Sequence, residues 1–258
     1  MLGPALVTCL QVGSVLGYAL TSLKLVRTGL YHRYPVFSCY LAFGALNSTW
    51  PLFLSVSSAW YQYLWVLTEP IYWIFYIWVV LELCRLVLER HRGLYTLGRW
   101  AMALGMAISV TLSVLSLLPR VRPANPLRSK VMSFVLATDR GVTFSLAIFL
   151  VLMLFLLSRY PVRLSRNVVL HTILYTLFFI SNTLSVILWT VFGKHVYTAV
   201  DTGLAVVSLG CILGWLLFLS PRGEEVLSNF PHLGPEYERQ MLQHLDSLNA
   251  TLLKVSRK

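Results

Sequence analysis

Seven long apolar runs restrict what this chain can fold into. Each run is about 20 residues long, which is the length of an α-helix that crosses the hydrocarbon core of a bilayer. Only 12% of the 258 residues are charged, about half the share found in soluble domains. The sequence therefore predicts an all-α protein, a bundle of seven transmembrane helices over residues 1–220. The expected spans are 4–23, 36–57, 63–84, 98–118, 131–157, 167–191 and 199–220.

The positions of lysine and arginine predict the orientation of these spans. Fifteen basic residues fall in segments on the side of the carboxyl terminus, and five fall in segments on the opposite side. Cytoplasmic segments of membrane proteins carry the excess of positive charge. We therefore expect an integral protein of the cytoplasmic (inner) membrane, with its amino terminus outside. The net charge of +11 belongs to these segments and gives no basic, aromatic face for nucleic acid.

Polar and ionisable residues inside the apolar runs give the strongest indication of function, because such residues are costly in hydrocarbon. In the predicted orientation most of them lie in the outer half of the membrane, beside several aromatic residues. The pattern predicts a polar pocket, walled by aromatic rings, that opens outward and binds a small molecule or lipid. The predicted ligand-binding residues are Asn47, Glu69, Tyr72, Trp73, Tyr76, Asp139, Arg140, Asn182 and Asp201.

Two alternatives concern the same residues. Arg140 forms an ion pair with Glu69 or Asp139 that fixes helix register, or these charges contact a ligand. Pro70 follows Glu69 directly, and proline removes a backbone donor from a helix. If a helix of the bundle is bent or interrupted, we expect this at Pro70 in the third span, around a cavity.

Three further patterns predict how the helices pack. Residues 171, 175, 178, 182, 185 and 189 share one face of the sixth span and include His171, Tyr175 and Ser185; we expect this face inside the bundle. The GxxxG pairs at 13/17 and 210/214 favour close helix contacts, within the molecule or with another subunit. Residues 82, 85, 89 and 92 alternate in charge along one helix face, as a solvated, self-paired helix end does.

The chain lacks the motifs of the familiar membrane and soluble enzymes. It contains no HExxH, GxSxG or P-loop pattern,. Residues 199–220 hold no lysine for a retinal Schiff base, and His171 is the single histidine within a span. The four cysteines are not at metal-ligand spacing,. We expect a protein that is not an enzyme and that has no cofactor and no metal.

The carboxyl-terminal segment changes in composition after the last span. Residues 221–235 contain three prolines and two glycines and predict a linker. Residues 236–258 predict a cytoplasmic amphipathic helix, with apolar side chains in heptad spacing. This helix either joins copies of the chain in a homo-oligomer or lies on the membrane or the bundle. The predicted oligomerisation residues are Met241, Leu245, Leu248, Leu252 and Val255.

In layout, with its TEPIYW segment and LELCRLVLER helix, the chain resembles the stand-alone seven-helix membrane proteins of environmental bacteria. More distantly, it resembles the seven-helix sensor modules of bacterial signalling proteins. The resemblance implies a non-catalytic protein of sensor or receptor type. Sensor modules normally continue into a kinase or cyclase domain, which this chain does not have, so it does not imply signal output by the same polypeptide.

Three functions remain open from the sequence. A receptor requires an aromatic pocket open to the outer side. An accessory or scaffolding subunit, which binds partner membrane subunits, requires a dry bundle and a large apolar outer face. A small-solute transporter requires a site near the middle of the membrane that is reached from both sides.

Overall fold

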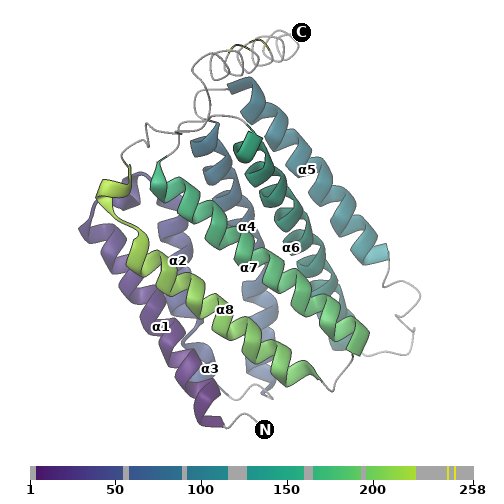
Figure 1. Cartoon of the computed structure of the whole chain (residues 1–258). Helices are drawn as coiled ribbons and strands as arrows, with labels where there is room; N and C mark the ends of the chain where they lie inside the picture. The colour runs from purple at the N-terminus through teal and green to yellow at the C-terminus, as the bar shows by residue number, and fades with distance from the viewer. Residues whose placement is uncertain are drawn as a thin grey trace.

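Long helices that run roughly along one axis form the molecule (Figure 1). The computed structural model describes residues 4–54, 58–88, 92–115, 127–159, 165–192 and 196–224, with residues 243 and 247. Within these ranges the chain is all-α, as predicted, with seven helices of 13 residues or more. They are α1 (Pro4–Arg27), α2 (Pro35–Asn47), α4 (Ala59–Val87), α5 (Arg92–Leu115), α6 (Leu127–Arg159), α7 (Arg166–Phe192) and α8 (Tyr197–Phe218). The short elements are η1 (Leu30–His32), α3 (Trp50–Phe53) and η3 (Pro221–Glu224).

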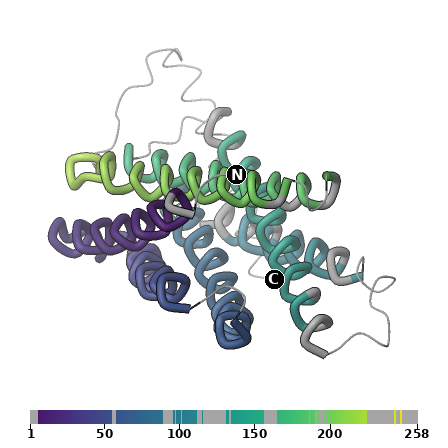
Figure 2. Tube along the Cα trace, turned by 90° about the horizontal axis from the view of Figure 1, so that it is seen from below, coloured from purple at the N-terminus to yellow at the C-terminus, as the bar shows by residue number. Residues whose placement is uncertain are grey.

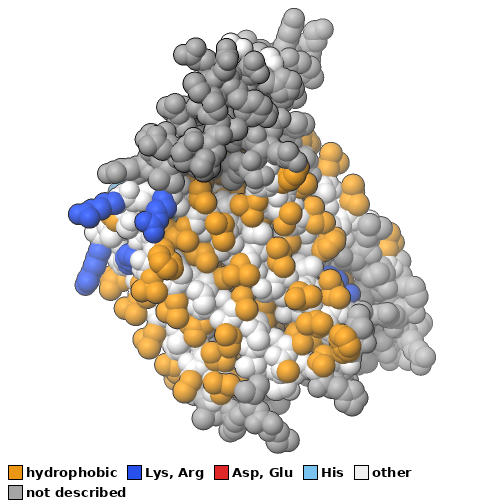
Figure 3. All heavy atoms as spheres, viewed as in Figure 1, with side chains coloured by type: hydrophobic (Ala, Val, Ile, Leu, Met, Phe, Trp, Pro, Cys, Tyr) orange, Lys and Arg blue, Asp and Glu red, His pale blue; other side chains and the backbone are white. Residues whose placement is uncertain are grey.

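Five helices in the described part of the chain are long and apolar enough to cross a membrane. Their outward side chains are large and apolar, among them Leu16, Trp78 and Leu217, which are more than half exposed. Figure 3 shows such side chains spread across one face, with the lysine and arginine side chains at its edge. A surface of this kind is stable in lipid and costly in water. The five spans are Leu6–Arg27, Ala59–Val87, Phe134–Phe155, Arg166–Trp189 and Thr198–Phe218.

The second predicted span is broken, and the expectation of one helix over 36–57 is wrong in its middle. α2 ends at Asn47 after 13 residues, which is about 20 Å at 1.5 Å per residue. Pro51 in the first turn of α3 lacks a backbone donor and would clash with the preceding turn of a continuous helix. At the break, Gln11 of α1 donates a hydrogen bond of 2.7 Å to the carbonyl oxygen of Ser48.

α4 shows the opposite outcome at Pro70. The helix runs without interruption through this proline from Ala59 to Val87, so the expected interruption there is wrong. A proline inside a helix costs about 3 kcal/mol, and tertiary packing can offset such a cost. α4 packs against α2, α5, α6 and α7, and these contacts can offset the cost of the proline within the helix.

The helices alternate in direction along the chain, and their contacts connect them into a closed bundle. α1 packs against α2 and α8, α7 packs against α4, α6 and α8, and α5 packs mainly against α6. Figure 2 shows α1 lying between α2 and α8. The ends where α1 and α8 finish and α7 begins lie together at the upper left of Figure 1. We call this the basic end of the bundle, because exposed Arg27, Arg33, Arg85, Arg166 and Arg222 surround it.

The two GxxxG pairs have different roles in packing. Gly13 and Gly17 face α8, where a Cβ atom on Gly17 would lie 2.7 Å from the Ile212 side chain. Gly214 faces α7, whereas a Cβ atom on Gly210 would meet no atom within 4 Å. Close packing within the molecule therefore accounts for three of these four glycines. The predicted oligomerisation seam of the tail lies outside the described residues.

Candidate functional site

Two carboxyl groups meet between α4 and α6. Glu69 of α4 and Asp139 of α6 lie close enough to interact directly. Trp73, one helical turn after Glu69, donates its indole N–H to Oδ1 of Asp139 over 3.1 Å. Two carboxylates in contact away from water repel each other strongly. The pair is therefore stable when a proton or another cation neutralises one of its two charges.

Aromatic rings from α2, α4 and α7 continue this cluster toward the core. The rings of Tyr72 and Tyr76 are 5.9 Å apart, and Tyr76 lies 5.9 Å from Tyr40 and 5.2 Å from Phe179. The side chain of Asn47 lies close to the hydroxyl of Tyr72. Six of the nine predicted site residues thus occupy one region. They are Asn47, Glu69, Tyr72, Trp73, Tyr76 and Asp139.

A small cleft lies between the broken α2–α3 segment and the start of α4. Its volume is about 30 Å³, and a polar cavity holds a water molecule when it exceeds about 10–15 Å³. Thr68, which precedes Glu69 in α4, lines it. The cleft has room for water or a small ion. Its other lining residues are Asn47, Trp50, Pro51, Tyr61, Leu64 and Trp65.

Among the described side chains, no hydrogen bond or ion pair joins the remaining three predicted residues to this region. Arg140 is exposed, and among the described side chains no ion pair within 4.0 Å joins it to Glu69 or Asp139. Successive helix residues point about 100° apart, so Asp139 faces α4 and Arg140 does not. The predicted register ion pair is therefore not formed. Asn182 donates to the carbonyl oxygen of Phe178 in its own helix over 2.9 Å, and Asp201 is exposed on α8.

A second polar network, at the basic end, was missed by the sequence reasoning. Glu224 in η3 accepts a hydrogen bond of 2.7 Å from the hydroxyl of Tyr34 and another from Nδ2 of Asn167. Nε of Arg33 lies 3.7 Å from Oε2 of Glu224. Asn167 also donates to the carbonyl oxygen of Ser220 over 2.8 Å. The network ties the end of α8 to the start of α7 and to the first connection.

Tyr34 is a constant hydrogen-bond donor in this network. Burial, together with the neighbouring Glu224 carboxylate, raises the pKa of Tyr34 well above its ordinary value of about 10,. A raised folded-state pKa stabilises the fold fully below the unfolded-state pKa and loses this effect as the pH rises through the folded-state pKa. The contribution of Tyr34 to stability is therefore complete below about pH 10.

Glu82 has a role that its charge pattern did not predict. Its two carboxylate oxygens accept hydrogen bonds from the backbone N–H groups of Val36 and Phe37, over 3.0 and 3.1 Å. These donors belong to the first turn of α2, where a helix has no partners for its N–H groups. The expected solvated, self-paired face is therefore wrong for Glu82, which caps a neighbouring helix.

The predicted inward face of the sixth span is confirmed for its buried members. His171, Tyr175 and Phe178 are at most 8% exposed, and Ser185 is 6% exposed. The imidazole of His171 lies between the rings of Tyr34 and Phe37, at 4.7 and 4.5 Å. Among the described residues, neither nitrogen of His171 has a hydrogen-bond partner.

Replacing Glu224 with alanine is expected to loosen the basic end. Tyr34 and Asn167 would lose a charged acceptor, which lowers the free energy of unfolding by about 2 kcal/mol. The measurement is thermal unfolding in detergent, followed with a thiol-reactive dye. Cys84 and Cys211 are buried and react on unfolding, whereas the exposed Cys9 and Cys39 are first changed to serine. Arg222→Ala, in the same short helix, is the control, and equal midpoints for the two variants would contradict the prediction.

Comparison with known protein families, known proteins and solved structures finds no match to this chain. No family is thus identified for it, and the resemblance noted from its layout has no support from these comparisons. What the sequence and structure together establish is a helical protein with several long apolar helices, whose candidate spans place it in a lipid bilayer.

Proposed function

We propose that this chain is a non-catalytic membrane protein of sensor or receptor type that binds a small cation, in the first place a proton, between Glu69 and Asp139. The observation that carries the proposal is the close approach of these two carboxyl groups, one of which, Asp139, accepts a hydrogen bond from the indole of Trp73. A pair of this kind changes its interactions when it gains or loses a cation, and that change is the signal.

The position of Arg140 supports a mobile cation over a structural one. A carboxyl pair inside a bundle is commonly neutralised by a nearby arginine or lysine. Arg140 follows Asp139 in the chain, yet it is exposed and lies more than 4.0 Å from either carboxylate. Among the described side chains, no arginine or lysine within 4.0 Å neutralises the pair, so a proton or another cation can take this role.

α4 links the pair to the basic end of the bundle. Glu69 and Glu82 are 13 residues apart on this one helix, about 20 Å at 1.5 Å per residue. Glu82 caps α2, so a shift or rotation of α4 at the pair alters the cap at the far end. We further propose seven crossings, with the amino terminus outside. In the cytoplasm the signal then passes to another copy of the chain, bound through the tail seam, or to a partner subunit.

The test is a titration of the full chain in lipid nanodiscs. We expect an infrared band of a protonated carboxyl group that disappears at high pH, together with a change in the fluorescence of Trp73. Glu69→Gln and Asp139→Asn should each abolish both responses. Asp201→Asn, which removes an exposed carboxyl group of α8, should leave them unchanged, and Trp73→Phe identifies the fluorescence change among the eight tryptophans.

The same titration separates a proton from other cations. If sodium or methylammonium at constant pH displaces the infrared band, the pair binds these ions in competition with the proton. If pH alone moves it, the ligand is the proton. A band and a fluorescence response that are the same in the wild type and in both carboxyl variants would refute the proposed site.

A cation-coupled transporter of small solutes is a second candidate, favoured by the break between α2 and α3. Transporters often place their sites at interrupted helices, and Asn47 at this break lies close to Tyr72, one turn from Glu69 on α4. Proteoliposomes distinguish the two functions. A pH gradient that the protein dissipates, and that Glu69→Gln preserves, indicates transport, whereas a preserved gradient in the wild type leaves the sensor.

A further inference from the structure

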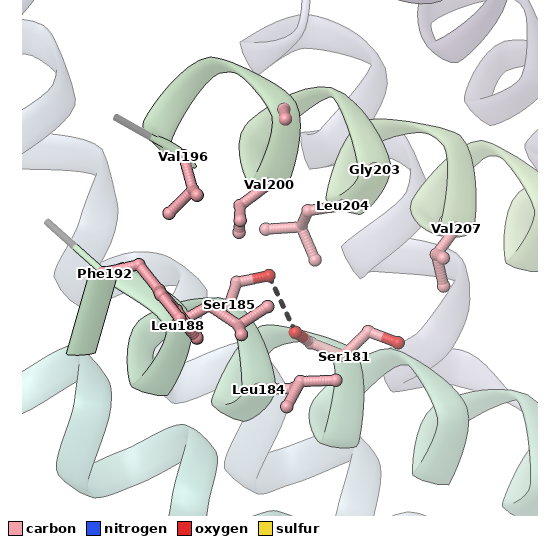
Figure 4. A pocket seen from close by; sticks show the side chains of 11 residues that line it. Ser181, Leu184, Ser185, Leu188, Phe192, Val196, Val200, Gly203, Leu204 and Val207 are labelled. Carbon is pink, nitrogen blue, oxygen red and sulfur yellow. Dashed lines mark hydrogen bonds between the residues drawn. The ribbon is translucent and has the colours of Figure 1, made fainter. Parts of the chain in front are cut away.

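An apolar groove lies between α7 and α8, toward the end of the bundle opposite the basic end. Its volume is about 490 Å³. Figure 4 shows side chains of both helices directed into it, among them Leu188 and Phe192 from α7 and Val200 and Leu204 from α8. We call it the α7–α8 groove. It is a feature separate from the carboxyl pair, which lies between α4 and α6.

The chemistry of the lining excludes a polar occupant. All its side chains are uncharged, and nearly all are aliphatic or aromatic. The two exceptions are Ser181 and Ser185, and the hydroxyl of Ser185 donates to the carbonyl oxygen of Ser181 over 2.8 Å within α7. An ordered polar ligand requires hydrogen-bond partners that this lining does not supply. The groove therefore favours hydrocarbon.

The groove lies where the hydrocarbon chains of membrane lipids can reach it. Most of its lining residues belong to the candidate membrane spans Arg166–Trp189 and Thr198–Phe218. Leu184 and Phe192, which line it, are 51% and 57% exposed on the outer surface of the bundle. An apolar protein cavity of about 150 Å³ already takes up a molecule such as benzene. A groove of about 490 Å³ that opens into the bilayer has room for a longer chain.

Gly203 keeps the groove open on the side of α8. A Cβ atom on this glycine would meet no atom within 4 Å, so a large side chain at this position would fill the space. Gly210 is also exposed on α8 and also has no atom within 4 Å of a Cβ position, but it does not line the groove. The two glycines form a matched pair, one inside the groove and one outside it.

We propose that the α7–α8 groove is a binding site for one hydrocarbon chain of a phospholipid from the surrounding leaflet. The chain lies along the aliphatic side chains of the two helices, and the headgroup remains at the membrane surface. Each methylene group of the bound chain contributes to the binding free energy through van der Waals contacts with the side chains of the groove. A lipid chain that stays outside the groove does not make these contacts.

The test uses the full chain in nanodiscs that contain a phospholipid with a photoreactive diazirine in its acyl chain. We expect labelling, mapped by mass spectrometry of peptides, to concentrate on residues 181–207. Gly203→Phe should reduce it about tenfold, which corresponds to a loss of about 1.4 kcal/mol of binding. Gly210→Phe should keep it at the wild-type level. Ala199→Phe, a second variant that fills the groove, should repeat the loss, and the thiol-dye unfolding assay identifies any variant that fails to fold.

Two outcomes would overturn the proposal. One is labelling spread evenly over all lipid-facing helices. The other is equal labelling of folded Gly203→Phe, Ala199→Phe and Gly210→Phe. Native mass spectrometry of the released protein identifies the occupant. A retained phospholipid mass that folded Gly203→Phe lacks supports the site as proposed, and a free fatty acid or another apolar molecule in its place refutes the phospholipid.

Discussion

Replacing Gly141 with leucine is expected to separate α5 from α6 and to lower the free energy of unfolding by about 3 kcal/mol or more. Gly141 lies against the backbone of α5, where a Cβ atom would come within 2.8 Å of Cα and 3.0 Å of N of Val110. Backbone atoms cannot move aside by a change of rotamer, so the helices themselves must move apart.

The same replacement would also break a polar contact between the two helices. The hydroxyl of Ser109 donates to the carbonyl oxygen of Gly141 over 3.0 Å. This distance is already at the long end for such a hydrogen bond, so the bond would break if α5 and α6 moved further apart. α5 packs mainly against α6, so few other contacts would compensate. In lipid, where the hydrophobic effect does not hold helices together, close backbone contacts of this kind carry much of the packing energy.

The thiol-reactive unfolding assay measures this effect. Gly141→Leu should lower the midpoint markedly, and Gly141→Ala should lower it less, because a single methyl group requires a smaller movement. The matched control is Gly210→Leu, which adds the same side chain where no atom lies within 4 Å. A midpoint for Gly141→Leu as high as that of the control would show that α5 and α6 are not in backbone contact.

Replacing Glu82 with alanine is expected to have the second-largest effect. The backbone N–H groups of Val36 and Phe37 would lose their acceptors at a half-buried position. Buried donors without partners cost about 1–3 kcal/mol each, so a loss of about 2–3 kcal/mol of stability follows. α2 is only 13 residues long, which leaves it little packing area to offset the loss.

A conservative replacement distinguishes the cap from a general loss of packing. Glu82→Gln retains one acceptor oxygen and should recover part of the stability, whereas Glu82→Ala recovers none. Arg85→Ala, one turn further along α4 and exposed, serves as the control for the loss of a charge on this helix. If Glu82→Ala and Arg85→Ala unfold at the same temperature, the carboxylate does not support α2.

The candidate site was predicted in part because its signal is local. Glu69 and Asp139 stood out as carboxyl groups inside apolar runs, and their distance from the ends of the runs placed them at a similar depth. That they lie close to each other, and that Arg140 turns away, depends on how α4 and α6 are rotated about their axes. The cap at Glu82 was not predicted, because the backbone N–H groups that donate to it lie 46 and 45 residues away in the sequence.

The sequence by itself determined that this chain is a set of long apolar α-helices, since length and hydropathy are properties of each segment alone and a helix satisfies its own backbone in lipid. Only the tertiary structure decided which proline interrupts a helix. A helix ends before Pro51, where Gln11 of α1 bonds to the break, whereas α4 continues through Pro70 and packs against four neighbouring helices. It also decided that Glu224 meets Tyr34, 190 residues away. Such contacts depend on the packing of helices against one another, which no single segment encodes.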